Sequence, residues 1–271
     1  MNAPPPPSRL ARMPWWLLLL AGAGVLLLGL GLSHPGYRDI FGAIGRGLFI
    51  TVRVTVIAYV ASLLVGTILA LGLVSSHRWL RELTKAWVEI MRGVPMLVLL
   101  YAIAFAIGPA VVAAYADVFA GPIAEGWLPA LSVRDFSFEW RAILALTVAY
   151  SAFIAEIMRG GIEAIPAGQS EAAFALGLTR FKTLRLIVLP QAFKTMLPPL
   201  GNDLVSMLKD SSLVSVLGVG DITQIGKTYS SATFLFFETY TVVAFFYLVM
   251  TISLSVLVRR LEQRLRRNEA R

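Results

Sequence analysis

Six stretches of this 271-residue chain are each long and apolar enough to cross a lipid bilayer, and they constrain its fold more than any other feature. A spanning helix needs about 20 mostly apolar residues to cross a hydrocarbon core of about 30 Å. The stretches cover approximately residues 15–32, 48–74, 94–113, 141–158, 190–208 and 236–258. The sequence therefore predicts an all-α polytopic membrane protein with about six transmembrane helices.

The composition agrees with a membrane protein. Hydrophobic residues make up 57% of the chain and charged residues 15%, which is more apolar surface than a soluble domain of this length could bury. The 24 Lys and Arg exceed the 16 Asp and Glu, but they gather at the ends of the apolar stretches. We therefore expect the basic residues to meet lipid headgroups and expect no nucleic-acid partner. The absence of cysteine excludes disulfides and thiolate chemistry.

The distribution of positive charge predicts the orientation, because short loops rich in Lys and Arg resist translocation. With a cytoplasmic N-terminus, the inside segments hold most of the basic residues, namely Arg9, Arg12, Arg78, Arg81, Lys85, Arg92, Arg159, Arg180, Lys182, Arg185 and the tail 259–271. We expect residues 1–14 to be a disordered, proline-rich cytoplasmic segment. The apolar run that follows has no small-x-small cleavage site, so an uncleaved membrane helix is predicted, with both termini cytoplasmic.

Two other segments are less regular. Residues 211–226 are apolar but short and broken by glycines and Asp221, which predicts a partly inserted or interfacial segment. Residues 115–140 form a long external loop with four carboxylates and several aromatic side chains. A plain connector and a docking surface for an extracytoplasmic partner both remain open for this loop.

The polar segment 166–190, "PAGQSEAAFALGLTRFKTLRLIVLP", predicts two short helices on the cytoplasmic surface. Pro166 and Gly168 interrupt the preceding helix, and the alanine-rich turn that follows favours a helix from about Gln169. Gly177 predicts a bend, and Thr179 can cap a second helix. On periodicity alone the segment is typical of an ordinary amphipathic surface helix.

A pattern within this segment resembles a known family. Glu171, Ala172 and Ala173 are followed by Gly177 and then by Ile187, Leu189 and Pro190, which reproduces the spacing E-A-A, three residues, G, nine residues, I-x-L-P. This pattern resembles the signature loop of permease subunits of binding-protein-dependent ABC importers. The polar amino-acid branch of that family is similar at further positions, which are Arg92, Gly93, Pro95, Leu97, Glu156, Arg159, Gly160, Gly161, Gly168, Gln169, Pro198, Pro199, Asn202, Lys209, Asp210, Ser212 and Leu213.

The resemblance implies a domain organisation and a set of partners. Residues 47–258 would form the permease domain with a five-helix core, and residues 15–46 an extra N-terminal transmembrane helix with a short external loop. The loop residues that would couple to a separate ABC ATPase subunit are Gly168, Gln169, Glu171, Ala172, Ala173 and Gly177. A second permease, identical or homologous, and an extracytoplasmic amino-acid-binding protein would complete the importer in the bacterial inner membrane. ATP and Mg would bind the ATPase partner, with no cofactor in this chain.

Polar residues within the predicted spans are candidates for the substrate path, because ionisable groups at a helix centre cost about 2.5–3.5 kcal/mol on insertion and therefore face a protein interior or water. These candidates are Glu156, Asn202, Asp203, Ser206, Lys209 and Asp210. Plainer interpretations stay open: Glu156 could pair with Arg159, and Lys209 and Asp210 could mark the outer membrane interface.

Other functions fit the sequence less well. The run "GVGDITQIGKT" has five residues between Gly220 and Gly226 where a phosphate-binding loop has four, so we expect no ATP site and no catalytic site in this chain. A membrane enzyme would need a cluster of catalytic residues, and a channel would need a filter loop, and neither pattern is found. A permease for a related small polar solute, such as an opine or another amino-acid derivative, remains an alternative. The sequence does not identify the amino acid or decide between homodimer and heterodimer.

Overall fold

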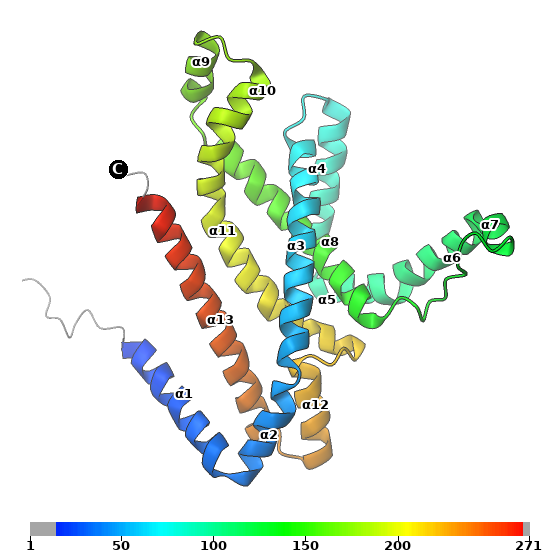
Figure 1. The fold of residues 1–271 in the computed structure, drawn as a ribbon, viewed down its shortest axis with the longest axis vertical. Helices are drawn as coiled ribbons and strands as arrows, with labels where there is room; N and C mark the ends of the chain where they lie inside the picture. Colours follow the sequence, from blue (N-terminus) through cyan, green and yellow to red (C-terminus); the bar gives the residue numbers. More distant parts are fainter. Residues whose placement is uncertain (1–14, 268–271) are drawn as a thin grey trace, which may run out of the picture.

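The computed structural model describes residues 15–267, and this part of the chain is helical, with no strand (Figure 1). The α-helices are α1 (Trp15–Ser33), α2 (Pro35–Gly45), α3 (Leu48–Leu73), α4 (Arg78–Gly93), α5 (Met96–Tyr101), α6 (Gly108–Val118), α7 (Ala120–Ala124), α8 (Phe138–Glu163), α9 (Ala167–Ala175), α10 (Arg180–Thr183), α11 (Leu189–Asp210), α12 (Ile222–Thr233) and α13 (Phe236–Arg267). The π-helical segments are η2 (Ala102–Ile107) and η3 (Leu184–Val188), and η4 (Ser211–Leu217) is a 3₁₀ helix.

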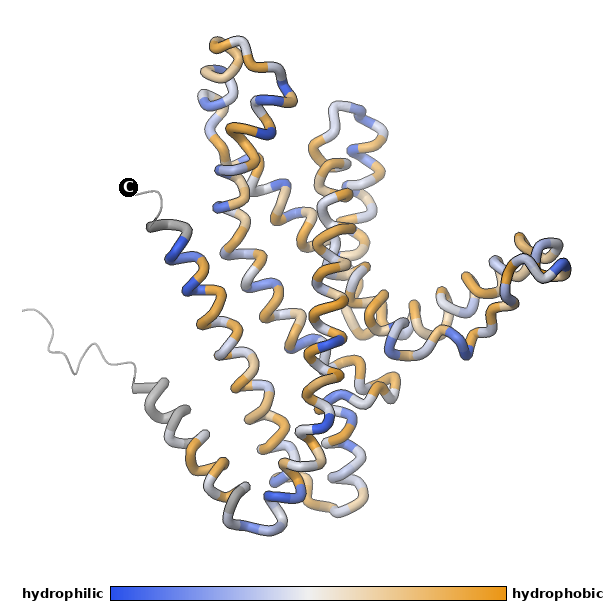
Figure 2. The backbone as a smooth tube through the Cα atoms, viewed as in Figure 1, coloured by the Kyte–Doolittle hydropathy of each residue, from blue (hydrophilic) through white to orange (hydrophobic). Residues whose placement is uncertain are grey.

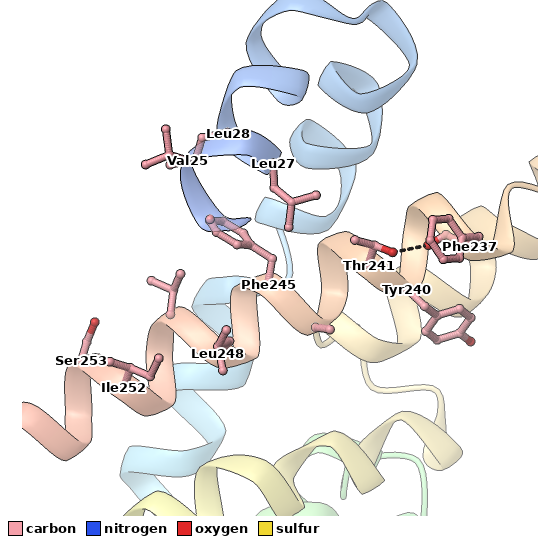
Figure 3. Close-up of a pocket in the computed structure, with 13 residues that line it drawn as sticks. Val25, Leu27, Leu28, Phe237, Tyr240, Thr241, Phe245, Leu248, Ile252 and Ser253 are labelled. Atoms are coloured by element: carbon pink, nitrogen blue, oxygen red, sulfur yellow. Dashed lines mark hydrogen bonds between the residues drawn. The ribbon is translucent and has the colours of Figure 1, made fainter. Parts of the chain in front are cut away.

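All six predicted apolar stretches are helical, which confirms the all-α prediction. Within the described residues, four helical segments are long and apolar enough to cross a membrane: Pro35–Leu73, Met96–Val118, Phe138–Glu163 and Phe236–Arg264. Helix α11 occupies the fifth predicted stretch over 22 residues, but it carries four charged side chains and is not among those four. The chain is therefore a polytopic helical bundle in which one helix, α11, is distinctly polar (Figure 2).

Helices α3 and α8 form the centre of the bundle, because small residues let their backbones approach closely. A Cβ atom at Gly66 of α3 would lie 2.6 Å from a side-chain carbon of Ile154 on α8. The hydroxyl of Ser62 donates a hydrogen bond to Thr147 O of α8 at 3.3 Å. Ala58 and Leu146, both fully buried, belong to the hydrophobic core that surrounds this contact.

Two helices were not predicted. Helix α2 stands where a short external loop was expected, and it buries Ile40 and Ile44 against Ile222 of α12 and Val242 of α13. Helix α4 precedes the third apolar stretch, and its buried Val88 faces the contact with α3 and α8. Both were missed because the first is short and the second is interrupted by charged residues, so neither forms a continuous apolar run.

The third predicted stretch is a bent helix. It begins as α5, continues through the π-helical segment η2 and ends as α6, beyond residue 113 where the stretch was expected to end. Helices α6 and α7 project away from the bundle in Figure 1 and occupy the first part of the predicted external loop. The loop 115–140 is thus partly helical.

The seventh, irregular segment begins as a 3₁₀ turn and then reverses at Gly218, which has a φ of 76°. Asp221 caps α12 by accepting hydrogen bonds from Thr223 N at 3.1 Å and Gln224 N at 2.9 Å. Beyond it, α13 continues to Arg267, so the first part of the predicted basic tail is helical. The predicted disordered segment 1–14 and the last residues, 268–271, lie outside the described residues.

The two ends of the bundle differ. The α3–α4 turn, the α9 and α10 segment and the C-terminal end of α13 lie at one end in Figure 1. The α1–α2 corner and α12 lie at the other end. The first end therefore gathers the polar segments that the charge distribution had placed on one side of the membrane.

Candidate functional site

The segment between α8 and α11, residues 164–188, forms a compact bent structure that we call the α9–α10 loop. Helix α9 ends at Gly177, where φ is 80°. The N–H of Gly177 donates to Phe174 O at 2.9 Å and the N–H of Leu178 to Ala173 O at 3.1 Å, which is the hydrogen-bond pattern of a Schellman motif. Thr179 then caps α10 by accepting from Lys182 N at 3.4 Å. The predicted arrangement of helix, glycine bend and capped helix is confirmed.

The α9–α10 loop exposes apolar side chains although it stands outside the bundle (Figure 1). Leu176 is 82% exposed, and Phe174 and Phe181 are also exposed. Ala173 is buried, as α9 packs against α10 and η3. Gln191 of α11 ties the loop to the bundle by donating to Gln169 Oε1 at 3.4 Å. A fixed element with an apolar surface outside the bundle is suited to bind another protein.

The six loop residues chosen from the sequence all lie on α9 or at its C-terminal end, and all except Ala173 are exposed; they are Gly168, Gln169, Glu171, Ala172, Ala173 and Gly177. A Cβ atom at Gly177 would meet no heavy atom within 4 Å. The glycine is therefore required by the backbone conformation and not by a close contact.

A second group of polar side chains lies between α11 and its neighbours α3 and α8. Tyr150 of α8 donates its hydroxyl hydrogen to Asp210 Oδ2 at 2.7 Å. Tyr59 of α3 donates to the backbone oxygen of Leu200 at 2.7 Å. Asp203, one helical face with Asp210, lies within electrostatic reach of both tyrosines. Two carboxylates and two phenols thus meet inside the bundle.

Asp203 differs from Asp210 in its hydrogen bonding. Its Oδ2 atom is buried and has no hydrogen-bond partner among the described residues. A buried carboxylate oxygen without a donor is costly, so a donor from outside this chain would stabilise it. The arrangement can accept a cationic group, such as the ammonium of a small solute.

Glu156 lies apart from this group. It pairs with Arg159 on the same helix, through a hydrogen bond of 3.1 Å from Nε and a second from Nη2, and Arg159 also contacts Glu163. Arg92 of α4 lies nearby, with its guanidinium 5.7 Å from the ring centroid of Phe153. The simpler interpretation of Glu156, an ion pair with Arg159, is what the structure shows.

The remaining candidates lie on α11. Ser206 is half-buried beside Asp203, whereas Asn202 and Lys209 are exposed. Exposed polar side chains on a helix in the bundle would face lipid if nothing covered them. The α11 surface is therefore suited to contact with another protein or with a water-filled path.

The glycine-rich run at residues 218–228 offers no phosphate site. The carboxylate of Asp221 already accepts the N–H groups of Thr223 and Gln224, and Ile222 N donates to Thr51 Oγ1 at 3.2 Å. The N-terminus of α12 thus has no free N–H donors in its first turn for an anion.

Sequence reasoning missed Tyr59 and Tyr150. Each is a tyrosine in the middle of an apolar stretch, where a buried hydroxyl needs a partner, and that requirement is the signal that could have found them. Arg141 was also missed. It is buried near the start of α8 and donates to Phe136 O and Ala104 O, both at 2.8 Å, and to Val133 O.

Comparison with known proteins defines the class to which this fold and loop belong. The model of the family described as "Binding-protein-dependent transport system inner membrane component" matches residues 62–267. The chain belongs to this family and is an inner-membrane component of a transport system. The family is one of transport permeases, which agrees with the resemblance seen in the α9–α10 loop.

Individual relatives cover most of the chain. The chain is 34% identical over 230 residues to "Probable glutamine ABC transporter permease protein GlnM" of Bacillus subtilis, covering 85% of this chain and 96% of that protein. It is 31% identical over 256 residues to "Glutamine transport system permease protein GlnP" of Escherichia coli, covering 94% and 91%. It is 29% identical to "Arginine transport system permease protein ArtQ" of Bacillus subtilis, covering 83% and 93%.

A solved structure shares the fold. The crystal structure of an amino acid ABC transporter with histidines aligns with a TM-score of 0.69 and 33% identity, covering 86% of this chain and 97% of that one. The described fold is therefore that of an ABC importer permease.

Proposed function

We propose that this chain is the permease subunit of an ABC importer for a polar amino acid, and that the α9–α10 loop binds the ATPase subunit. The observation that carries the proposal is the fixed bend at Gly177, which presents Glu171, Ala172 and the apolar Leu176 outside the bundle. Exposed apolar side chains on an ordered loop favour a protein partner over water. Small residues on α9 allow that partner to approach closely.

The substrate path we propose runs beside α11. Asp203, with its unpartnered carboxylate oxygen, would bind the ammonium group of the amino acid, and Asp210 is held by Tyr150. The names of the relatives, which refer to glutamine and arginine, support a polar amino acid as the substrate. Asn202, Ser206 and Lys209 would supply hydrogen bonds and a positive charge on the same helix.

The proposed assembly contains two permeases, two ATPase subunits and an extracytoplasmic binding protein. The exposed polar side chains of α11 support a second permease, identical or homologous, at that surface. The basic residues of α4 and α10 support a cytoplasmic position for the α9–α10 loop, with both termini on the same side. ATP and Mg would bind the ATPase subunits, and no cofactor is assigned to this chain.

Binding of the ATPase subunit can be tested by co-purification from membranes. We expect Leu176→Glu to reduce the amount of bound ATPase at least tenfold, because it places a charge in an apolar interface. Leu176 is 82% exposed, so the substitution should leave folding and membrane insertion unchanged. The matched control Leu176→Met keeps an apolar side chain and should retain the ATPase. Normal ATPase binding by the Leu176→Glu variant would contradict the proposal.

A further inference from the structure

Helices α6 and α7, with the return segment to residue 137, form an arm that leaves the bundle (Figure 1). The arm departs at the π-helical segment η2, whose wider turn changes the helix direction. Gly108 follows η2, and a Cβ atom there would lie 2.9 Å from Ile103 O. Pro109 cannot donate a backbone hydrogen bond and further weakens the helix at this point. The sequence thus directs the arm away from the bundle at a defined position.

Helix α6 is apolar and almost wholly uncovered. Gly108 is its one buried residue, and Val111 and Val118 are 61% and 73% exposed. No charged residue occurs from residue 93 to residue 116. The exposed residues point in several directions around the helix, so a protein partner on one side would leave others in water, whereas lipid would surround them all.

The polar character of the arm increases along its length. Asp117 is the first charged residue, and Glu125 follows at the end of α7. Trp127, 78% exposed, comes next. Tryptophan is enriched where a membrane meets water, and carboxylates belong on the aqueous side of that boundary. This order of residues matches a path from acyl chains to headgroups.

Arg141 fixes the base of the arm. Its guanidinium donates to Ala104 O in η2 and to Phe136 O and Val133 O in the return segment. The same group lies 4.9 Å from the ring centroid of Phe138. Because the arginine joins both limbs of the arm, the arm has a set direction although little of its own surface is buried.

We propose that the arm lies in the bilayer, with α6 among the lipid acyl chains and α7 and Trp127 at the headgroups. The arm would thereby anchor the extracytoplasmic half of the permease in the lipid, an assignment of side that rests on the proposed function. The depth of the arm in the membrane does not depend on that assignment, so the two can fail separately. A docking surface in water and a contact with a second copy are the competing outcomes.

Spin labels on single cysteines can measure this depth, because the chain has no cysteine of its own. The full-length chain is labelled at Val111→Cys, Val118→Cys or Glu125→Cys in nanodiscs of phosphatidylethanolamine and phosphatidylglycerol. Collision with oxygen reports lipid, and collision with a water-soluble nickel chelate reports water. We expect the oxygen-to-nickel ratio to be highest at Val111 and to fall through Val118 to Glu125, with Ser76→Cys, in the α3–α4 turn, as the aqueous reference.

Two results would overturn the proposal. A Val111 label as accessible to nickel as the Ser76 label would place the arm in water, and a Val111 label reached by neither reagent would place it against protein. The role of Arg141 is tested in the Val111→Cys background. We expect Arg141→Lys to increase label mobility, since lysine cannot join three carbonyls, while Arg134→Lys in the same limb leaves it unchanged. Equal mobility in the two variants would refute the anchoring role.

Discussion

Replacement of Gly177 by valine is expected to reduce ATP-driven uptake at least tenfold while leaving the protein in the membrane. Gly177 adopts a φ of 80°, a left-handed conformation that costs an L residue about 1–2 kcal/mol and a β-branched residue more. A Cβ atom would meet nothing within 4 Å, so the effect would come from the backbone alone. A change in the bend would misdirect α9 and its contact with the ATPase, and about 1.4 kcal/mol corresponds to the tenfold loss.

The matched variant Gly177→Asn separates this effect from a general loss of stability. Asparagine tolerates the left-handed conformation and occurs at helix C-termini, so it should retain most of the uptake. The measurement is substrate-stimulated ATP hydrolysis together with uptake in proteoliposomes. Wild-type values for both in Gly177→Val would show that the bend does not couple the two subunits.

The second large effect is expected at Asp203. Asp203→Asn preserves the size of the side chain but removes the charge proposed to bind the substrate ammonium group. A hydrogen bond to a charged group contributes about 1.5–3 kcal/mol, so the loss should lower substrate affinity or uptake roughly 10- to 100-fold. Binding of the ATPase at the α9–α10 loop should not change, because that loop is distant along α11.

Glu125→Gln is the control for Asp203→Asn, because it makes the same chemical change in an exposed residue of the arm. Uptake by this variant should equal that of the wild type. If Asp203→Asn also transports within about twofold of the wild type, the substrate ammonium group binds elsewhere and the assignment of Asp203 is wrong.

The long apolar stretches and local signals of the α9–α10 loop were readable from the sequence. Burial of apolar residues and backbone hydrogen bonding act along the chain there, so the six stretches are helical, and Gly177 and Thr179 have the local roles predicted for them. Helix α4 was missed because Lys85 and other charges divide its apolar positions, although Val88 is buried. Amphipathic helices in a membrane protein are easily taken for loops when only long apolar runs are sought.

The candidate substrate site was only half predicted. Asp203 and Asp210 were identified because charges within a span are costly. Their aromatic neighbours were not, since Tyr150 contacts Asp210 across 60 residues of sequence and Tyr59 reaches Leu200 across 141. Such contacts depend on which helices pack together, and that packing is decided by small residues such as Gly66, whose role appears only once its neighbours are known.

Transport itself is measured most directly by reconstituting the chain in proteoliposomes with its ATPase and binding protein. Labelled glutamine and arginine would be supplied outside, and ATP inside. We expect ATP-dependent accumulation of a polar amino acid that requires all three components and is lost in Gly177→Val. Accumulation that needs neither ATP nor the ATPase, or the absence of transport for every polar amino acid with the ATPase bound, would contradict the proposed function.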